Sequence, residues 1–163
     1  MLSQFFRKKW IVAAILSLVF SVLTGCGTVY RTPQLGQPSS TVRTVYEREG
    51  LFTWTSVKIE SIDNQSAGLQ MLSNAKMRVH PGPHMLTIIA EFNLGAFSGP
   101  FSAIVDVKAD FKPYQDYRIK TSIQGSRFLA WVVDDKGKQV SAVSSVGYEL
   151  APTHSTIFIP VKR

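Results

Sequence analysis

Two histidines frame a short proline-rich turn in the middle of the chain, in the sequence His80-Pro81-Gly82-Pro83-His84. The residues on either side alternate between apolar and polar side chains, so we expect them to form the two strands of a β-hairpin. In such a hairpin the two imidazoles would lie opposite each other on one sheet face, within reach of a shared metal ion. A metal site needs at least one further ligand, which the sequence does not identify. In the alternative interpretation, His84 caps the turn through a hydrogen bond and His80 is a solvated edge residue.

The only cysteine, Cys26, ends the motif Leu23-Thr24-Gly25-Cys26 and follows a basic segment and an apolar stretch, residues 10–23. As a helix this stretch would be about 21 Å long at roughly 1.5 Å per residue, short of the ~30 Å hydrocarbon core of a bilayer. It therefore predicts a signal peptide, with an uncleaved membrane anchor as the alternative. The motif resembles the bacterial lipobox, which implies cleavage before Cys26 and attachment of acyl chains to it. The glycine that follows implies export to the outer membrane.

Charge and composition divide the rest of the chain into a tether and a domain. Without the three cations of residues 7–9, 15 Lys and Arg face 11 Asp and Glu, a net charge of +4. The two signs are interleaved, which argues against a nucleic-acid surface and leaves open a weak attraction to anionic headgroups or polysaccharide. Residues 26–43 are rich in Pro, Gly, Ser and Thr and predict a flexible tether with a reach of about 20 to 25 Å. Residues 44–163 are then a single domain.

Period-two alternation dominates that domain, and no segment shows a convincing helical period. The sequence therefore predicts an all-β protein, an antiparallel β-sandwich of about seven strands, with a small barrel as the alternative. The interpretation of residues 44–50 stays open between linker and edge strand. The predicted strands are residues 54–62, 75–80, 84–92, 101–111, 117–123, 128–133 and 139–143, with 155–161 as a candidate edge strand.

Four short motifs resemble those of small bacterial lipoproteins of unknown function, and more distantly those of PEGA-type β domains. The resemblance implies a β domain at the cell surface or in the envelope and carries little about activity. The motifs are Ile62-Asp63-Asn64, Pro81-Gly82-Pro83-His84, Tyr117-Arg118-Ile119 and Trp131-Val132-Val133-Asp134-Asp135-Lys136-Gly137.

The glycine-rich apolar loop at residues 94–100 is the candidate contact for a partner, because Phe97 has no core register and loops commonly carry function. We expect an outer-membrane-anchored lipoprotein whose periplasmic β domain binds or assembles another envelope protein, by this loop or by strand addition. The alternative is a periplasmic module that binds a metal or small ligand through His80 and His84. A hydrolase would need an acid, base or nucleophile set that we do not find, so we expect neither enzymatic activity nor a cofactor.

Overall fold

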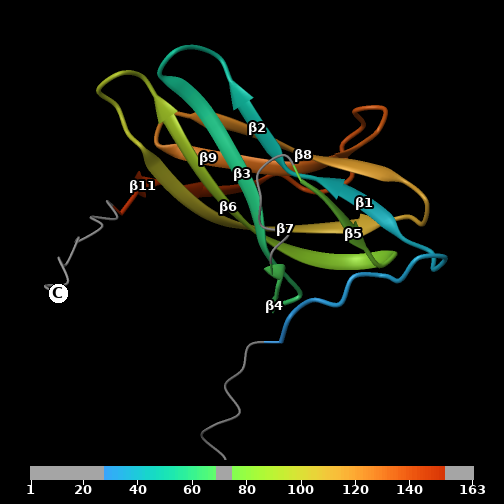
Figure 1. Cartoon of the computed structure of the whole chain (residues 1–163). Helices are drawn as coiled ribbons and strands as arrows, with labels where there is room; N and C mark the ends of the chain where they lie inside the picture. Colours follow the sequence, from blue (N-terminus) through green and yellow to red (C-terminus); the bar gives the residue numbers. More distant parts are fainter. Residues whose placement is uncertain (1–27, 69–74, 153–163) are drawn as a thin grey trace, which may run out of the picture.

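The structure is a computed structural model that describes residues 28–68 and 75–152 (Figure 1). Cys26 and the predicted edge strand at 155–161 lie outside the described residues. The described strands are β1 (Ser40–Arg43), β2 (Val45–Arg48), β3 (Thr53–Ile62), β4 (Gln65–Ser66), β5 (Lys76–Val79), β6 (Gly82–Leu94), β7 (Phe101–Phe111), β8 (Asp116–Gln124), β9 (Arg127–Asp134), β10 (Ser144–Gly147) and β11 (Glu149–Leu150).

These strands form two sheets that pack face to face (Figure 1). One sheet has the order β10-β9-β8-β1-β5, and the other has the order β11-β7-β6-β3-β2, with β4 paired to β3. Every strand pair is antiparallel except β1 with β8, which is parallel. The predicted all-β sandwich is confirmed, with more strands than the expected seven because several short ones are added.

Alternation along the strands places the core between the sheets. In β7, Ala103, Val105 and Val107 face inward, whereas Asp106 and Lys108 face solvent. One end of the core is aromatic, because the ring of Phe92, near the end of β6, stacks on that of Phe128 with centroids 5.5 Å apart. Each such buried apolar side chain stabilises the fold by about 1.5 to 3 kcal/mol relative to its exposed state.

The predicted tether is wrong from Thr28 onward, and so is the predicted start of the domain at residue 44. Tyr30 is buried, and β1 lies between β8 and β5 with Val42 fully buried. At Thr44 the chain crosses from one sheet to the other, where the Thr44 N–H donates to the Ala75 carbonyl at 3.0 Å. Residues 45–48, which the sequence left open, form the edge strand β2.

The predicted hairpin around Pro81 to Pro83 is also wrong. Strand β5 pairs only with β1, whereas β6 pairs with β3 and β7 in the other sheet. The proline turn therefore connects the two sheets. A second error lies near the C-terminus of the described chain, where residues 139–143 form only isolated bridges and the strand is Ser144–Gly147.

Candidate functional site

The histidines belong to a polar network built on the turn between β3 and β4. Asp63 and Asn64 both adopt left-handed backbone conformations, with φ of 50° and 62°, as a two-residue hairpin turn requires. Asp63 then faces the start of β6, where its Oδ1 accepts a hydrogen bond from the Met85 N–H at 2.9 Å. Its Oδ2 lies 2.6 Å from Nδ1 of His84. The turn thus positions an acid beside an imidazole.

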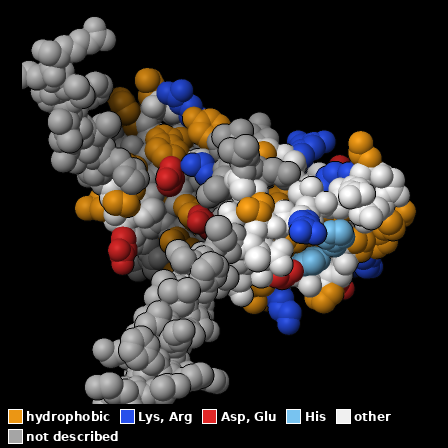
Figure 2. Space-filling view, turned by 60° about the horizontal axis from the view of Figure 1, so that its bottom comes forward, with side chains coloured by type: hydrophobic (Ala, Val, Ile, Leu, Met, Phe, Trp, Pro, Cys, Tyr) orange, Lys and Arg blue, Asp and Glu red, His pale blue; other side chains and the backbone are white. Residues whose placement is uncertain are grey.

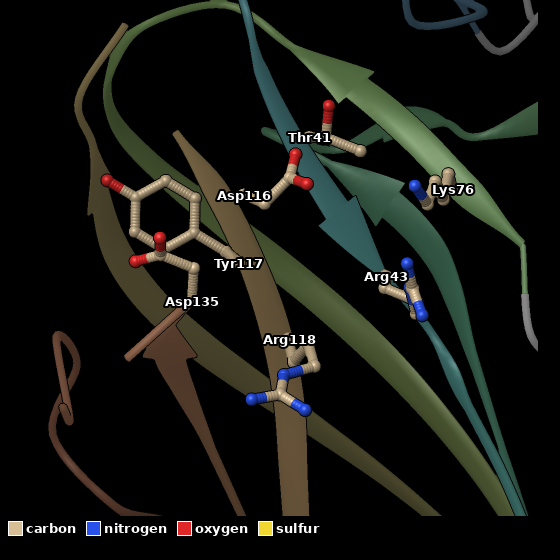
Figure 3. A pocket seen from close by; sticks show the side chains of 7 residues that line it. All are labelled: Thr41, Arg43, Lys76, Asp116, Tyr117, Arg118 and Asp135. Atoms are coloured by element: carbon tan, nitrogen blue, oxygen red, sulfur yellow. The ribbon is translucent and has the colours of Figure 1, made fainter. Parts of the chain in front are cut away.

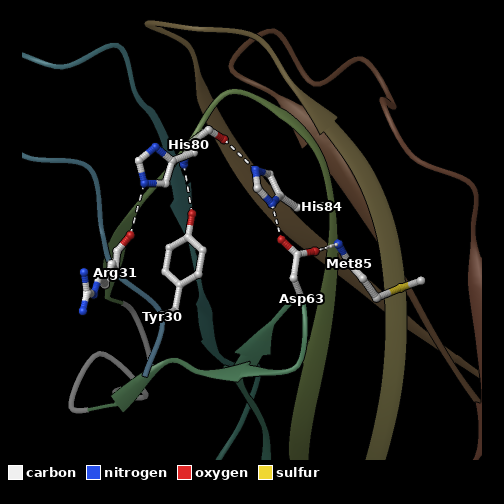
Figure 4. Close-up of polar contacts among 6 residues, drawn as sticks. All are labelled: Tyr30, Arg31, Asp63, His80, His84 and Met85. Carbon is white, nitrogen blue, oxygen red and sulfur yellow. Dashed lines mark hydrogen bonds and ion pairs between the residues drawn. The ribbon is translucent and has the colours of Figure 1, made fainter. Parts of the chain in front are cut away.

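Both ring nitrogens of His84 face acceptors (Figure 4). Nε2 lies 3.0 Å from the His80 carbonyl oxygen, and Nδ1 faces the Asp63 carboxylate. Only an imidazole with both nitrogens protonated can donate both hydrogen bonds, so the geometry suits a charged His84. The main-chain N–H of His80 donates to the Tyr30 hydroxyl at 3.0 Å, and the His80 Nε2 lies 3.2 Å from the Arg31 carbonyl oxygen. The network therefore joins the N-terminal segment to both sheets.

The electrostatics of the network favour an ionised Asp63. Desolvation raises the pKa of Asp63, but the hydrogen bonds from the Met85 amide and from His84, together with the charge of His84, outweigh it, so that the pKa is lowered. At Tyr30, desolvation and the charge of Asp63 raise the pKa, against a smaller opposing effect of the bond from His80. The contacts of Asp63 with the Met85 amide and with His84 thus stabilise the carboxylate form of its side chain.

This arrangement does not suit the predicted metal site. The two imidazoles do not sit opposite each other on a hairpin, and a metal ion would have to displace an existing partner from either nitrogen of His84. Among the described residues, no group of three or more His, Cys, Asp or Glu side chains is placed to hold a metal ion. Figure 2 shows the imidazoles as one surface patch with Lys and Arg side chains around it. The network instead fits a structural role, and we call it the polar clasp: Tyr30, Asp63, His80 and His84 with the backbone groups of Arg31 and Met85.

Phe97 lies in the loop between β6 and β7. This loop is at the same end of the sandwich as the β2–β3 loop, because Leu94 pairs with Thr53 (Figure 1). Its side chain is fully exposed on a tight loop, in which the Leu94 N–H donates to the Ser98 carbonyl at 3.1 Å. Strand register brings further exposed apolar residues to the same end, because Leu94 pairs with Thr53 and Leu150 pairs with Phe101. We call this group the apolar tip: Leu51, Phe52, Leu94, Phe97 and Leu150.

The N-terminal segment joins the sandwich at the opposite end, beside β4. The Ser66 N–H donates to the Thr28 carbonyl at 3.0 Å, and the Tyr30 N–H donates to the Ser66 carbonyl at 2.8 Å. The chain is therefore part of the fold from Thr28 onward. Among residues 28–68 and 75–152, no helix has the length and hydropathy needed to cross a membrane.

A depression on the outer face of the β1-containing sheet was not anticipated from the sequence (Figure 3). Its volume is about 250 Å³, and we call it the charged depression. Alternation in β1, β5 and β8 shows which of their side chains face outward. The sequence does not show that these three strands pair, so the depression could not be predicted from it. Its lining residues are Thr41, Arg43, Lys76, Asp116, Tyr117, Arg118 and Asp135.

No protein-family model, curated protein or solved structure matches this chain. The function is therefore inferred from the residues alone. The sequence contains a Ser-x-x-Lys spacing from Ser73 to Lys76, a pattern that some acyl-transferring enzymes use, but Ser73 lies outside the described residues. The features that the structure does place are the polar clasp, the apolar tip and the charged depression.

Proposed function

We propose that this protein is a lipid-anchored envelope protein whose β-sandwich is a non-enzymatic binding module, with its domain in the periplasm and its anchor in the outer membrane. The lipobox-like motif at residues 23–26 supports the anchor. Two or three acyl chains on one cysteine would hold the protein stably, since each buried methylene contributes about 0.8 kcal/mol.

The observation that carries the proposal is the placement of the apolar tip relative to the N-terminus. Only two residue steps separate Cys26 from Thr28, so a lipid on that cysteine lies within about 7 Å of the folded domain. The apolar tip is at the other end of β3, a strand of 10 residues that spans about 30 Å at roughly 3.3 Å per residue. An anchored domain would thus present its apolar tip well away from the bilayer, toward another envelope component.

Exposed apolar side chains along one end of the sheet favour a protein partner. Single exposed apolar residues are ordinary on protein surfaces, but contiguous groups mark interaction sites. Leu51 and Leu150 are 79 % and 70 % exposed, and Phe97 is fully exposed. An aromatic anchor of this kind commonly dominates the binding energy of an interface.

In-cell crosslinking followed by mass spectrometry tests the proposal. We expect the wild-type protein to capture a discrete envelope protein, and we expect Cys26→Ala and Phe97→Ala each to lose it. Ile104→Ala is the matched control, because Ile104 is an exposed apolar residue in the middle of β7 and lies outside the apolar tip. Equal capture by the wild type and the Phe97→Ala variant would remove the apolar tip from the proposal. Retention of the Cys26→Ala variant in the membrane fraction would argue against the lipid anchor.

A further inference from the structure

Three cations lie in one row on the outer face of β5, β1 and β8. Lys76 is in register with Arg43, and Arg43 is in register with Arg118, so one cation comes from each strand. Side chains opposite each other on adjacent strands are about 4.5 to 5.5 Å apart at Cβ, and like charges in such pairs destabilise a sheet. The row therefore costs stability that the fold itself does not require.

None of the three cations forms an ion pair with a carboxylate in the described parts of the chain. The ion pairs there are Lys58 with Glu91 and His84 with Asp63, and both lie away from this face. The three cationic side chains line the charged depression, one from each of three neighbouring strands (Figure 3). An unpaired cluster that lines a hollow is the arrangement expected for an anion site.

The charged depression has two sides of opposite sign. Asp116 is in register with Thr41 and lies two residues before Arg118 on the same outward face, about 7 Å along the strand at roughly 3.3 Å per residue. Asp135 lines the same hollow from the end of β9. A ligand with anionic groups at both ends would meet these carboxylates, whereas a ligand with an anion next to an ammonium would match both sides.

We propose that the charged depression binds a phosphoethanolamine group, with the phosphate on Arg43, Lys76 and Arg118 and the ammonium toward Asp116. A phosphate suits the row better than a carboxylate does, because its several tetrahedrally arranged oxygens can accept from donors on three strands at once. The group occurs both as a free compound and as a phospholipid headgroup. The site depends neither on the lipid anchor nor on the apolar tip, so its test is independent of the function proposed above.

Calorimetric titration of the full-length protein in maltoside micelles tests the site with O-phosphoethanolamine and with inorganic phosphate. We expect the wild type to bind O-phosphoethanolamine about tenfold more tightly than inorganic phosphate, because only O-phosphoethanolamine has an ammonium group that can reach Asp116. In the double variant Arg43→Gln/Arg118→Gln we expect binding of both compounds to weaken by at least about tenfold. Lys108→Gln is the control, because Lys108 is an exposed cation on the other sheet.

Two readouts separate binding from a merely structural role. The double variant is expected to melt no lower than the wild type, because it loses repulsion and no partner. Asp116→Asn is expected to abolish the preference for O-phosphoethanolamine over inorganic phosphate while leaving phosphate binding intact. The proposal is overturned if neither compound binds the wild type at millimolar concentration, if the double variant binds like the wild type, or if the preference survives Asp116→Asn.

The source of the group is distinguished by repeating the titration in lipid nanodiscs. If the site takes the headgroup of a surrounding lipid, phosphatidylethanolamine discs will suppress binding of the soluble compound and phosphatidylcholine discs will not. Equal binding in both discs assigns the site to a soluble phosphoethanolamine compound. In either case, the binding seen with the wild type must be absent from the double variant Arg43→Gln/Arg118→Gln.

Discussion

Phe92 and Phe97 lie five residues apart and have opposite surroundings. Phe92 is fully buried against Phe128, whereas Phe97 is fully exposed. We expect Phe92→Ala to lower the free energy of unfolding by about 3 to 5 kcal/mol, because it leaves a cavity in the aromatic core. Phe97→Ala is expected to change it by less than about 0.5 kcal/mol. Urea denaturation followed by circular dichroism measures both, and a large loss of stability in Phe97→Ala would show that its ring packs in solution.

The polar clasp makes a prediction about acid stability. Because the pKa of Asp63 is lowered in the folded protein, its ionisation adds stability above its unfolded pKa, and this contribution is lost as the pH falls through the lower folded value. Asp63→Asn cannot lose a charge, so its melting temperature is expected to fall less steeply than that of the wild type below about pH 4.

The control for this prediction is Asp110→Asn, since Asp110 is an exposed carboxylate on β7 and lies outside the clasp. Melting temperatures between about pH 2.5 and pH 6 are compared for the three proteins. Parallel curves for the wild type and Asp63→Asn would mean that ionisation of Asp63 does not contribute to the stability of the fold. A parallel fall in Asp110→Asn and the wild type is the expected control result.

At the scale of elements, β1 decides where the domain begins. It is an interior strand of its sheet, and β5 pairs with no other strand. A fragment that begins at residue 44 would lack β1 and leave both neighbours with unpaired backbone groups, which are costly when buried. We therefore expect a fragment that starts at residue 28 to fold cooperatively and one that starts at residue 44 to be largely unfolded. Amide proton dispersion in NMR spectra distinguishes them, and a well-dispersed spectrum from the shorter fragment would place β1 outside the essential fold.

Long alternating strands were predictable, and their partners were not. The strands at Thr53–Ile62 and Phe101–Phe111 carry several apolar residues in one phase, which specifies both strand and face. Strand β1 carries a single large apolar residue, Val42, in a stretch of Ser, Thr and Arg that composition alone assigns to a tether. Alternation does not specify which strands pair. The sequence around Pro81–Pro83 therefore predicts one hairpin, although the two strands belong to different sheets.

The same limit applies to the candidate sites. Phe97 was predictable as an exposed loop residue, because no register of either flanking strand accommodates it. The clasp was predictable only in part, since the turn at Asp63 is local whereas its contact with His84 depends on β3 lying beside β6. The charged depression depends on pairings between strands that are far apart in the chain, and it combines cations that the linear sequence interleaves with acids.

At the scale of the whole molecule, the fold would act as a spacer of defined length in a protein anchored at Cys26 as proposed. The contacts of Thr28 and Tyr30 with Ser66 would place β4 beside the anchor, so the length of β3 would set the distance between the apolar tip and the membrane. A flexible tether of the length that composition suggests would give no such fixed height. The distance between the anchor and the apolar tip can therefore be tested by lengthening the chain between them.

Insertion of about 20 Gly and Ser residues after Gly27 tests this geometry, because it adds a mean reach of about 25 Å without altering the domain. We expect the inserted form to stay in the membrane fraction and to melt like the wild type. We also expect it to lose most of the crosslink from the apolar tip, since a mobile domain samples the correct height only part of the time. The membrane fraction and the melting temperature of the inserted form are the internal controls, because both are expected to match those of the wild type. If the N-terminal insertion leaves the crosslink at full yield, the partner is reached by diffusion, and the fixed spacing between anchor and tip plays no part in its capture.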